Sequence, residues 1–220
     1  MDEFDILSQL NERGAVYTDQ HFVYTSGKHG SGYINMDPIF TELNLVKDIG
    51  YQLSVPFWQD GFDTVAAPAT GGIVLAFATA LGSPRSESVF PSIVWADKSG
   101  DDFVFERAGF ADQLKDKRVL VVEDLLTTGG SVIKTVRAAR SHGANVVGVS
   151  AVCNRGGLTA DDLNVPQLES LVSVSFETMP AGDCELCRKE VPIVADIGHG
   201  DEYQEKFPDY TGGYIKLLSA

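Results

Sequence analysis

The sequence is poor in cysteine, and it has no long apolar run. Its three cysteines are too few, and odd in number, for the disulfide framework of a small secreted protein, which favours a reducing compartment. It contains no run of 18 apolar residues for a membrane span, and the opening residues MDEFDILSQL lack the basic and apolar regions of a signal peptide. We therefore expect a soluble cytoplasmic protein that is not associated with a membrane.

Positive charge is also scarce. The chain has 17 Lys and Arg residues against 31 Asp and Glu residues, a formal net charge of -14. A broad surface for nucleic acid needs clustered cations, so this balance counts against a nucleic-acid partner. An anionic ligand would have to be neutralised locally, by backbone amides, a few placed cations and Mg2+.

The spacing of apolar runs predicts the fold class. At 220 residues the chain can bury a substantial core without disulfides. Strand patterns alternate with helical patterns, which predicts an α/β fold with a doubly wound, mostly parallel sheet and a ligand edge at the strand ends. The expected strands cover residues 64–67, 90–95, 118–122, 145–152 and 170–176. We expect one domain over 1–220, with a core at about 41–177 and a small hood subdomain formed by about 1–40 and part of the C-terminal third.

The most informative stretch is residues 118–131, RVLVVEDLLTTGGS. A β-branched apolar run leads to two carboxylates, Glu123 and Asp124, where the strand is expected to end, and a glycine turn then opens into a helix. Free amides at the start of that helix, the loop hydroxyl groups and the helix dipole together make a site for a phosphate. A simple helix cap would need one hydroxyl and no acid pair.

A second strand, turn and helix have the same plan at residues 64–82. The turn contains Ala69, Thr70, Gly71 and Gly72, and the helix after it is apolar nearly all round. Alone, this is an ordinary connection between a strand and a helix. Together with residues 118–131 it predicts a ligand with two phosphate groups, because parallel strands end at the same edge of a sheet.

Residues 118–131 closely resemble the phosphoribosyl pyrophosphate signature of the type I phosphoribosyltransferases, in which apolar residues lead to two acids and then to T-x-G-G-[ST]. The resemblance implies that the acid pair is catalytic and holds the ribose hydroxyls, while the loop binds the 5-phosphate. The implied ribose and 5-phosphate site is Glu123, Asp124, Leu125, Leu126, Thr127, Thr128, Gly129, Gly130 and Ser131. The resemblance also implies that residues 69–72 bind pyrophosphate, often with a non-proline cis peptide, and that the substrate carries Mg2+.

Residues 21–37 are similar to the segment that covers the base in the orotate phosphoribosyltransferases. Thr25 stands where those enzymes have a lysine, and one extra residue precedes Tyr33. Arg155 matches an arginine that contacts orotate in the family, and its planar fork suits a carboxylate. The implied base site is Ser26, Gly27, Lys28, Tyr33, Ile34, Thr127 and Arg155. His29 lies in the same loop, where we expect a solvated side chain.

A polar loop at residues 96–106 is similar to the loop that closes over pyrophosphate in these enzymes. Its candidate cations are Lys98, which we also treat as catalytic, and Arg107. The resemblance implies a homodimer in which residues 96–107 reach the neighbouring subunit. The implied activity is that of an orotate phosphoribosyltransferase, which converts orotate and phosphoribosyl pyrophosphate to orotidine 5'-monophosphate and pyrophosphate.

Two other functions remain open. A purine phosphoribosyltransferase would share the sugar-phosphate site and differ in residues 21–37, where Thr25 departs from the orotate pattern. A non-catalytic regulator that senses phosphoribosyl pyrophosphate would need a nucleic-acid-binding module and a basic patch. The net charge of -14 counts against the regulator.

Cys184 and Cys187 form a C-x-x-C pair. A zinc ion would need two further ligands, and the sequence offers Cys153, His199 and more distant histidines without a second paired motif. A redox pair would need a thioredoxin-like context, which is lacking. The sequence therefore favours a simple turn, with zinc as the lesser alternative, and assigns no role to the tail from 198 to 220.

Overall fold

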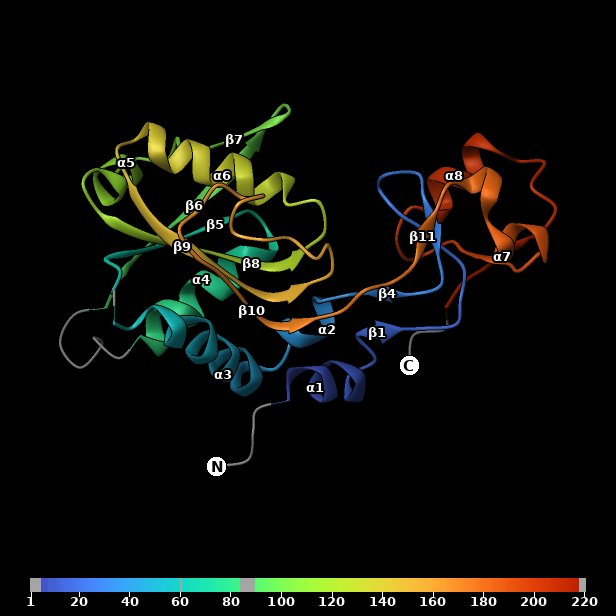
Figure 1. The fold of residues 1–220 in the computed structure, drawn as a ribbon, viewed down its shortest axis with the longest axis horizontal. Helices are drawn as coiled ribbons and strands as arrows, with labels where there is room; N and C mark the ends of the chain where they lie inside the picture. Colours follow the sequence, from blue (N-terminus) through green and yellow to red (C-terminus); the bar gives the residue numbers. More distant parts are fainter. Residues whose placement is uncertain (1–4, 60, 84–89, 218–220) are drawn as a thin grey trace. The chain divides into compact units, whose positions relative to one another are not determined.

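The computed structural model describes residues 5–59, 61–83 and 90–217. These residues form two compact units, which we describe separately (Figure 1). The core unit comprises Met1–Ile6 and Met36–Val174, and the small unit comprises Leu7–Asn35 and Ser175–Ala220. None of the helices in the described part of the chain has the length and apolar composition that a membrane crossing requires.

A six-stranded sheet forms the centre of the core unit. In spatial order its strands are β10 (Leu168–Ser173), β9 (Asn145–Asn154), β8 (Arg118–Leu126), β5 (Thr64–Pro68), β6 (Ser92–Ser99) and β7 (Asp102–Val104). The first five are parallel, and β7 pairs with β6 in the antiparallel sense. The carboxyl ends of the parallel strands therefore share one edge.

Helices cover both faces of this sheet. Figure 1 shows α3 (Leu43–Ser54) and α4 (Gly71–Gly82) on one face, and α5 (Phe110–Leu114) and α6 (Gly130–Ser141) on the other. Two short elements, α2 (Asp37–Phe40) and η1 (Val55–Phe57), flank α3. This confirms the doubly wound, mostly parallel α/β arrangement expected from the alternating sequence pattern.

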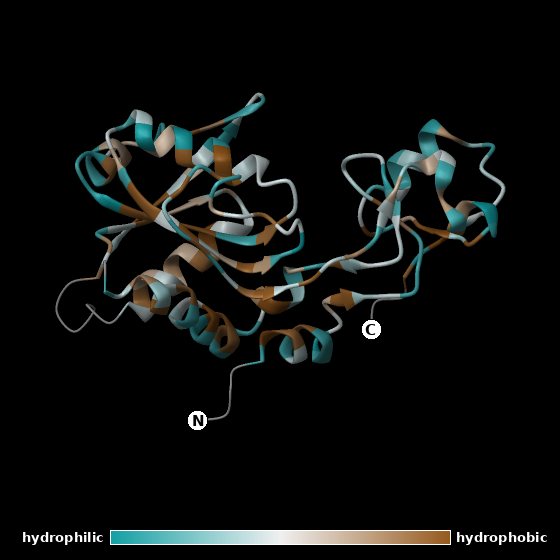
Figure 2. Cartoon of the chain, in the orientation of Figure 1, coloured by the Kyte–Doolittle hydropathy of each residue, from teal (hydrophilic) through white to brown (hydrophobic). Residues whose placement is uncertain are grey.

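The central strands are apolar without alternation because both of their faces are covered. Val119, Leu120, Val121 and Val122 of β8 are all 0% exposed, and every residue of β5 is buried. The strands of this sheet are accordingly among the most hydrophobic segments of the chain (Figure 2). A buried cluster on one side of the sheet joins β8 and β9 to α6 through Val132, Val136 and Ala139.

The small unit is built from short elements of two distant chain segments. Its N-terminal segment contains most of α1 (Ile6–Glu12), and then β1 (Val16–Tyr17), β2 (Phe22–Val23), β3 (His29–Gly30) and β4 (Tyr33–Ile34). Its C-terminal segment contains β11 (Thr178–Met179), η3 (Ala181–Asp183), α7 (Glu185–Arg188), β12 (Ile193–Val194), α8 (Gly200–Lys206) and β13 (Tyr214–Ile215). The two segments share a three-stranded antiparallel sheet in the order β11-β3-β2.

Candidate active site

The acid pair lies within β8. We expected the strand to end at Val122, and this boundary is wrong, because the ladder with β9 continues through Leu126, which pairs with Asn154. Glu123 is only 7% exposed, whereas Asp124 is partly exposed. The strand backbone therefore fixes the positions of both carboxylates at the carboxyl edge of the sheet.

Backbone N–H groups of the strand donate a hydrogen bond to each carboxylate. The Asp124 backbone N–H donates a hydrogen bond to Glu123 Oε1 at 3.1 Å, and the Leu125 N–H donates to Asp124 Oδ1 at 2.6 Å. Burial, with the neighbouring Asp124 carboxylate as a second cause, raises the pKa of Glu123 well above its usual range. The site therefore keeps a carboxyl group in a position where its ionised form is costly.

Replacing Glu123 with glutamine is expected to stabilise the ligand-free protein at neutral pH. The pKa of Glu123 is higher in the folded state than in the unfolded chain, so raising the pH above the unfolded value of about 4.3 destabilises the fold until the folded-state pKa is passed. Glutamine cannot ionise, so the variant avoids this loss of folding stability. Calorimetry should show a melting temperature at pH 7.5 higher by at least about 2 °C, and no gain at pH 4.

The control for this variant is Glu205→Gln, at an exposed position of α8. It should leave the melting temperature unchanged at both pH values. An equal shift of the Glu123→Gln protein at pH 4 and pH 7.5 would contradict the assigned burial cost.

The loop after β8 forms a small pocket at the start of α6. Gly129 adopts the left-handed conformation (φ 73°), which glycine favours, and its carbonyl oxygen accepts the first helical hydrogen bond from Ile133 at 2.8 Å. The hydroxyl-bearing Thr127, Thr128 and Ser131 are exposed along this pocket. The pocket lining is Glu123, Leu125, Leu126, Thr127, Thr128, Gly129, Gly130, Ser131 and Val132. Amides at the start of a twelve-residue helix and three hydroxyl groups can bind a phosphate there.

The turn after β5 converges on the acid pair. The Ala69–Thr70 peptide bond is cis, as the resemblance implied, and α4 begins at Gly71. A Cβ atom added at Gly71 would lie 2.4 Å from Asp124 Oδ2, and one added at Gly72 would lie 2.8 Å from the Cβ of Ala67. The glycines therefore allow the second turn to approach Asp124 closely, so both predicted phosphate loops belong to one site.

The polar segment at 96–106 is a β-hairpin. Lys98 lies in β6, opposite Phe103 of β7, because the strand continues to Ser99 instead of ending near Trp95 as expected. Arg137 of α6 forms an ion pair with Asp102, and Lys134 donates to the Asp101 carbonyl oxygen. In this conformation an ion pair and a hydrogen bond hold the hairpin against α6.

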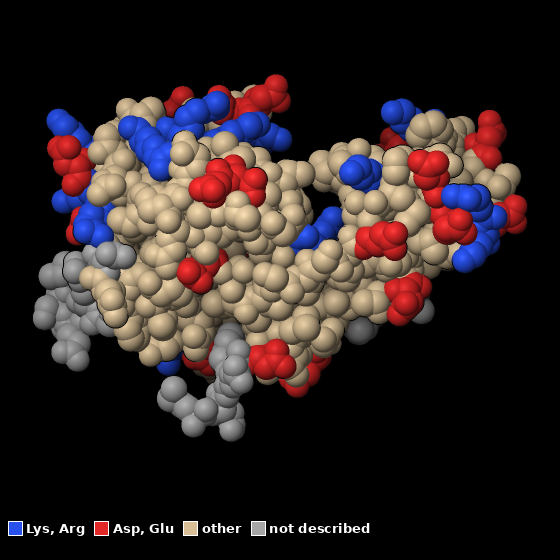
Figure 3. Space-filling view, viewed as in Figure 1, with Lys and Arg blue, Asp and Glu red and all other residues tan. Residues whose placement is uncertain are grey.

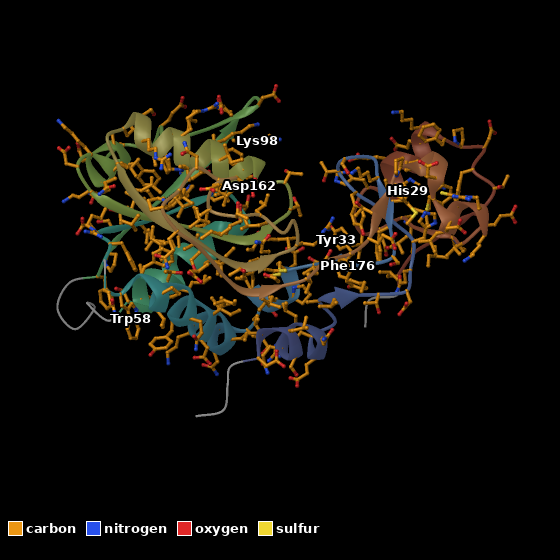
Figure 4. All side chains as sticks on the ribbon, in the orientation of Figure 1. His29, Tyr33, Trp58, Lys98, Asp162 and Phe176 are labelled. Atoms are coloured by element: carbon orange, nitrogen blue, oxygen red, sulfur yellow. The ribbon has the colours of Figure 1, made fainter. Side chains whose placement is uncertain are left out.

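The two candidate cations of the hairpin differ in their surroundings. Arg107 Nε donates to Asp97 Oδ2 at 2.9 Å, and its guanidinium lies 4.9 Å from the centre of the Trp95 ring. Lys98 is exposed, and Figure 4 shows it at the hairpin. On the face drawn in Figure 3, Lys and Arg side chains gather over α6 and this hairpin, with acidic side chains beside them. Lys98 is therefore the better candidate for contact with an incoming anion, because Arg107 already has a carboxylate partner.

Arg155 follows β9 at the same sheet edge. Its backbone N–H donates to the Leu126 carbonyl oxygen at 2.8 Å, which places it beside the start of the phosphate loop. A Cβ atom added at Gly156 would lie 1.8 Å from the Thr127 carbonyl oxygen. The core unit thus brings Arg155 and Thr127 next to the acid pair and the two turns.

The other predicted base residues lie in the small unit. Ser26, Gly27 and Lys28 form an exposed turn between β2 and β3, in which the Gly27 N–H donates to the Tyr24 carbonyl oxygen at 2.8 Å. Tyr33 and Ile34 form β4, and Ile34 is 2% exposed. Burial leaves the Ile34 side chain unavailable to a ligand.

A further pocket lies in the small unit, and no sequence pattern pointed to it. Thr25 Oγ1 and His199 Nε2 are 3.0 Å apart, and His199 Nδ1 lies 2.9 Å from Glu202 Oε2. Both Thr25 and His199 line this pocket, together with Gly27 and residues of α8. No spacing pattern links Thr25 to His199, which stands 174 positions later in the chain.

His29 corrects a second expectation. Its side chain is 0% exposed instead of solvated, because β3 lies in the middle of the three-stranded sheet of the small unit. Burial lowers its pKa to about 4. A buried histidine is a different kind of group from the solvated loop residue that we expected from the sequence.

Comparison with known proteins supports this description of the core unit. Residues 41–172 match the family model described as "Phosphoribosyl transferase domain". The chain is 33% identical over 186 residues to an orotate phosphoribosyltransferase of Caldanaerobacter subterraneus. The aligned region covers 84% of this chain and 93% of that protein.

Solved structures share the fold. The orotate phosphoribosyltransferase of Aeropyrum pernix is 25% identical, with a TM-score of 0.56 over 77% of this chain and 94% of the other. A Mycobacterium tuberculosis orotate phosphoribosyltransferase, solved in complex with 5-phospho-alpha-D-ribosyl 1-diphosphate, is 22% identical, with a TM-score of 0.52 over 64% of this chain and 80% of the other. The arrangement of the sheet is therefore that of a known enzyme fold.

Proposed function

This chain belongs to the phosphoribosyltransferase family, and on that premise we propose that it is an orotate phosphoribosyltransferase. It would transfer the 5-phosphoribosyl group from phosphoribosyl pyrophosphate to orotate, giving orotidine 5'-monophosphate and pyrophosphate. The observation that carries this proposal is that the Gly71 turn and the Thr127–Ser131 loop lie at the same acid pair, the first beside Asp124 and the second beside Glu123. Relatives that carry this name align with the chain over nearly their whole length.

In this proposal the core unit binds each part of the sugar phosphate. The pocket at the start of α6 would hold the 5-phosphate, and the cis turn at Ala69–Thr70 would hold the pyrophosphate. Glu123 and Asp124 would then lie against the ribose hydroxyl groups between them. The reaction needs positioning and charge stabilisation more than covalent chemistry by the protein, because one group replaces another at the anomeric carbon.

Mg2+ fits this site as an ion carried by the substrate. Carboxylate oxygens are the ligands that this ion prefers, and Asp124 offers a partly exposed pair of them at the sheet edge. When bound, the ion would supply positive charge to the pyrophosphate and ribose oxygens. The protein's own part is to orient the sugar with the acid pair and to exclude water.

Arg155 is our candidate for the orotate carboxylate. It lies at the carboxyl end of β9 beside Thr127, and a guanidinium can make two charge-assisted hydrogen bonds to a carboxylate. Ser26, Gly27, Lys28 and Tyr33 remain proposed contacts to the base from the small unit. The carboxylate of orotate is the feature that purine bases lack, so Arg155 favours orotate over a purine.

Replacing Lys98 with alanine is expected to lower kcat about 10- to 30-fold while KM for both substrates changes by less than about threefold. The lysine would stabilise the departing pyrophosphate, whose charge develops in the transition state, so its loss affects turnover more than binding. Steady-state kinetics with orotate measures both constants. Lys117→Ala, another exposed lysine of the core unit, serves as the control, and an unchanged kcat in Lys98→Ala would remove Lys98 from the mechanism.

We also propose a homodimer in the cytoplasm. The hairpin of β6 and β7 is exposed at its tip, Ser99–Asp102, where it could reach a neighbouring subunit. None of the three cysteines forms a disulfide, which suits a reducing compartment. Light scattering after gel filtration measures the dimer, and a monomer at micromolar concentration would contradict it.

One assay tests the function as a whole. Purified protein with Mg2+ and phosphoribosyl pyrophosphate is offered orotate, uracil, adenine, hypoxanthine and xanthine in turn, and base consumption is followed by absorbance. We expect consumption of orotate. Consumption of a purine alone would establish a purine phosphoribosyltransferase, and consumption of no base would favour a regulator that binds phosphoribosyl pyrophosphate.

A further inference from the structure

Four side chains with metal-binding atoms meet inside the small unit. They are His21, His29, Cys184 and Cys187, and their ligand atoms all lie within 4.8 Å of one another. The first three are 0% exposed, and Cys187 is partly buried. Figure 4 shows His29 beside sulfur atoms in the small unit. The cluster shares no residue with the proposed sites for the sugar phosphate and the base.

Four of the six separations between these ligand atoms are close to those of a tetrahedral metal shell. His21 Nε2 lies 2.9 Å from His29 Nδ1, 3.6 Å from Cys184 Sγ and 3.7 Å from Cys187 Sγ, and His29 Nδ1 lies 3.3 Å from Cys187 Sγ. With Zn–N at about 2.0 Å and Zn–S at about 2.3 Å, a tetrahedron places its ligand atoms about 3.3–3.8 Å apart. These four separations differ from the tetrahedral values by a few tenths of an ångström. The other two pairs of ligand atoms lie within 4.8 Å, so a zinc ion at the centre requires them to close by up to about 1 Å.

Hydrogen bonding alone accounts poorly for this arrangement. His21 Nδ1 donates to the Val191 carbonyl oxygen at 2.8 Å, so in the neutral ring Nε2 carries a lone pair. The other three atoms of the cluster, His29 Nδ1 and two sulfurs, all face that one nitrogen. A single lone pair can accept a hydrogen bond from only one of them. Cys187 Sγ has a second possible partner in His29 Nδ1, 3.3 Å away, but a cation at the centre binds all four atoms at once.

The surroundings of the cluster resemble those of a built metal site. The hydrogen bond from His21 Nδ1 to Val191 orients the imidazole and leaves Nε2 for a metal, which is the usual role of an outer partner. Tyr203 lies edge-on to the His29 ring, with centroids 4.8 Å apart, and Tyr210 lies 6.3 Å from His21 in the same orientation. These rings pack against the two imidazoles of the cluster.

The position of the cluster in the chain points to a structural role. His21 and His29 belong to the N-terminal segment of the small unit. Cys184 precedes the first residue of α7 and Cys187 lies in this helix, and Cys184 stands 163 positions after His21. The strands described in the small unit are each two residues long, and one hydrophobic cluster joins Phe22 and Tyr24 of its first segment to Val194 of its second. Small folds built from such short elements commonly depend on a metal ion or a disulfide.

We propose that His21, His29, Cys184 and Cys187 bind one zinc ion that joins the two segments of the small unit. Two sulfur and two nitrogen ligands in a tetrahedron select zinc, and four protein ligands leave no open position for catalysis. On binding, both thiols lose their protons to solvent and coordinate as thiolates. The C-x-x-C spacing, for which the sequence favoured a simple turn, thus supplies half of the ligand set.

Metal analysis of the full chain tests this proposal. Protein purified without added metal or chelator is expected to contain about one zinc ion per chain, and the Cys184→Ser and His29→Ala variants to contain less than a tenth of that. Cys153→Ala and His199→Ala are matched controls, because they change the other cysteine and histidine that the sequence offered as ligands; both should keep their zinc. A chelator should lower the melting temperature of the wild-type protein by several degrees.

Cobalt gives a test that does not depend on how the variants fold. Co2+ added to the reduced, metal-free wild-type protein is expected to give the strong visible absorption of a tetrahedral site and a near-ultraviolet band from thiolate ligands. Wild-type protein that holds neither zinc nor cobalt would overturn the proposal, as would a Cys184–Cys187 disulfide in protein purified under air with no metal bound. None of these readouts requires knowledge of the base that the enzyme uses.

Discussion

Asp124→Asn is expected to lower kcat by about 100- to 1,000-fold while leaving the fold intact. The substitution keeps the shape of the side chain and removes its negative charge, which would otherwise face the cation-like sugar in the transition state. Asp124 also lies against the second turn, with its Oδ2 atom next to Gly71. Steady-state turnover of orotate and phosphoribosyl pyrophosphate measures the effect.

A matched variant separates this effect from a general loss of acidity. Asp48→Asn changes an exposed aspartate of α3 and should retain full turnover. Circular dichroism and the melting temperature report whether Asp124→Asn still folds. Turnover within about threefold of the wild type in the folded variant would remove the acid pair from the proposed mechanism.

Gly71→Ala is expected to lower kcat/KM for phosphoribosyl pyrophosphate by about 100-fold, which corresponds to about 2.7 kcal/mol of transition-state stabilisation. The added methyl group would lie 2.4 Å from Asp124 Oδ2, so either the turn or the carboxylate must move. The helix itself should tolerate the change, because alanine is the better helix former and Gly71 does not have a positive φ.

The control for Gly71→Ala is Gly182→Ala. Gly182 has no atom within 4 Å of the position that a Cβ atom would occupy, and its φ is not in the left-handed region. Its substitution should change neither stability nor kinetics. If Gly71→Ala binds phosphoribosyl pyrophosphate as well as the wild type does, measured by calorimetry, then the close approach of the two turns has no functional role.

Local sequence patterns predicted the core unit well. The apolar run at Val119–Val122 indicated a strand buried on both faces, and the glycines near the starts of α4 and α6 marked the two turns. The predicted end of β8 at Val122 was wrong, because hydrogen bonding with β9 continues the strand past the polar Glu123. Lys98 is in a strand for the same reason, since β7 supplies it with a partner.

The small unit could not be predicted in this way. Its strands are two residues long, too short for any alternation of polar and apolar residues to appear. His29 was expected to be solvated because the residues around it are glycine, serine and lysine. The partners that bury it, including Tyr203 and Cys187, stand more than 150 positions later and follow no shared spacing.

The split of the small unit into two segments has a consequence for protein synthesis. Leu7–Asn35 leaves the ribosome first, but its sheet partner β11 and the cysteines of α7 follow only after the whole of Met36–Val174. At about 5–20 residues per second, a gap of some 140 residues corresponds to about 7–28 s of translation. The core unit can therefore finish folding on the nascent chain, while the first segment of the small unit waits for its second half.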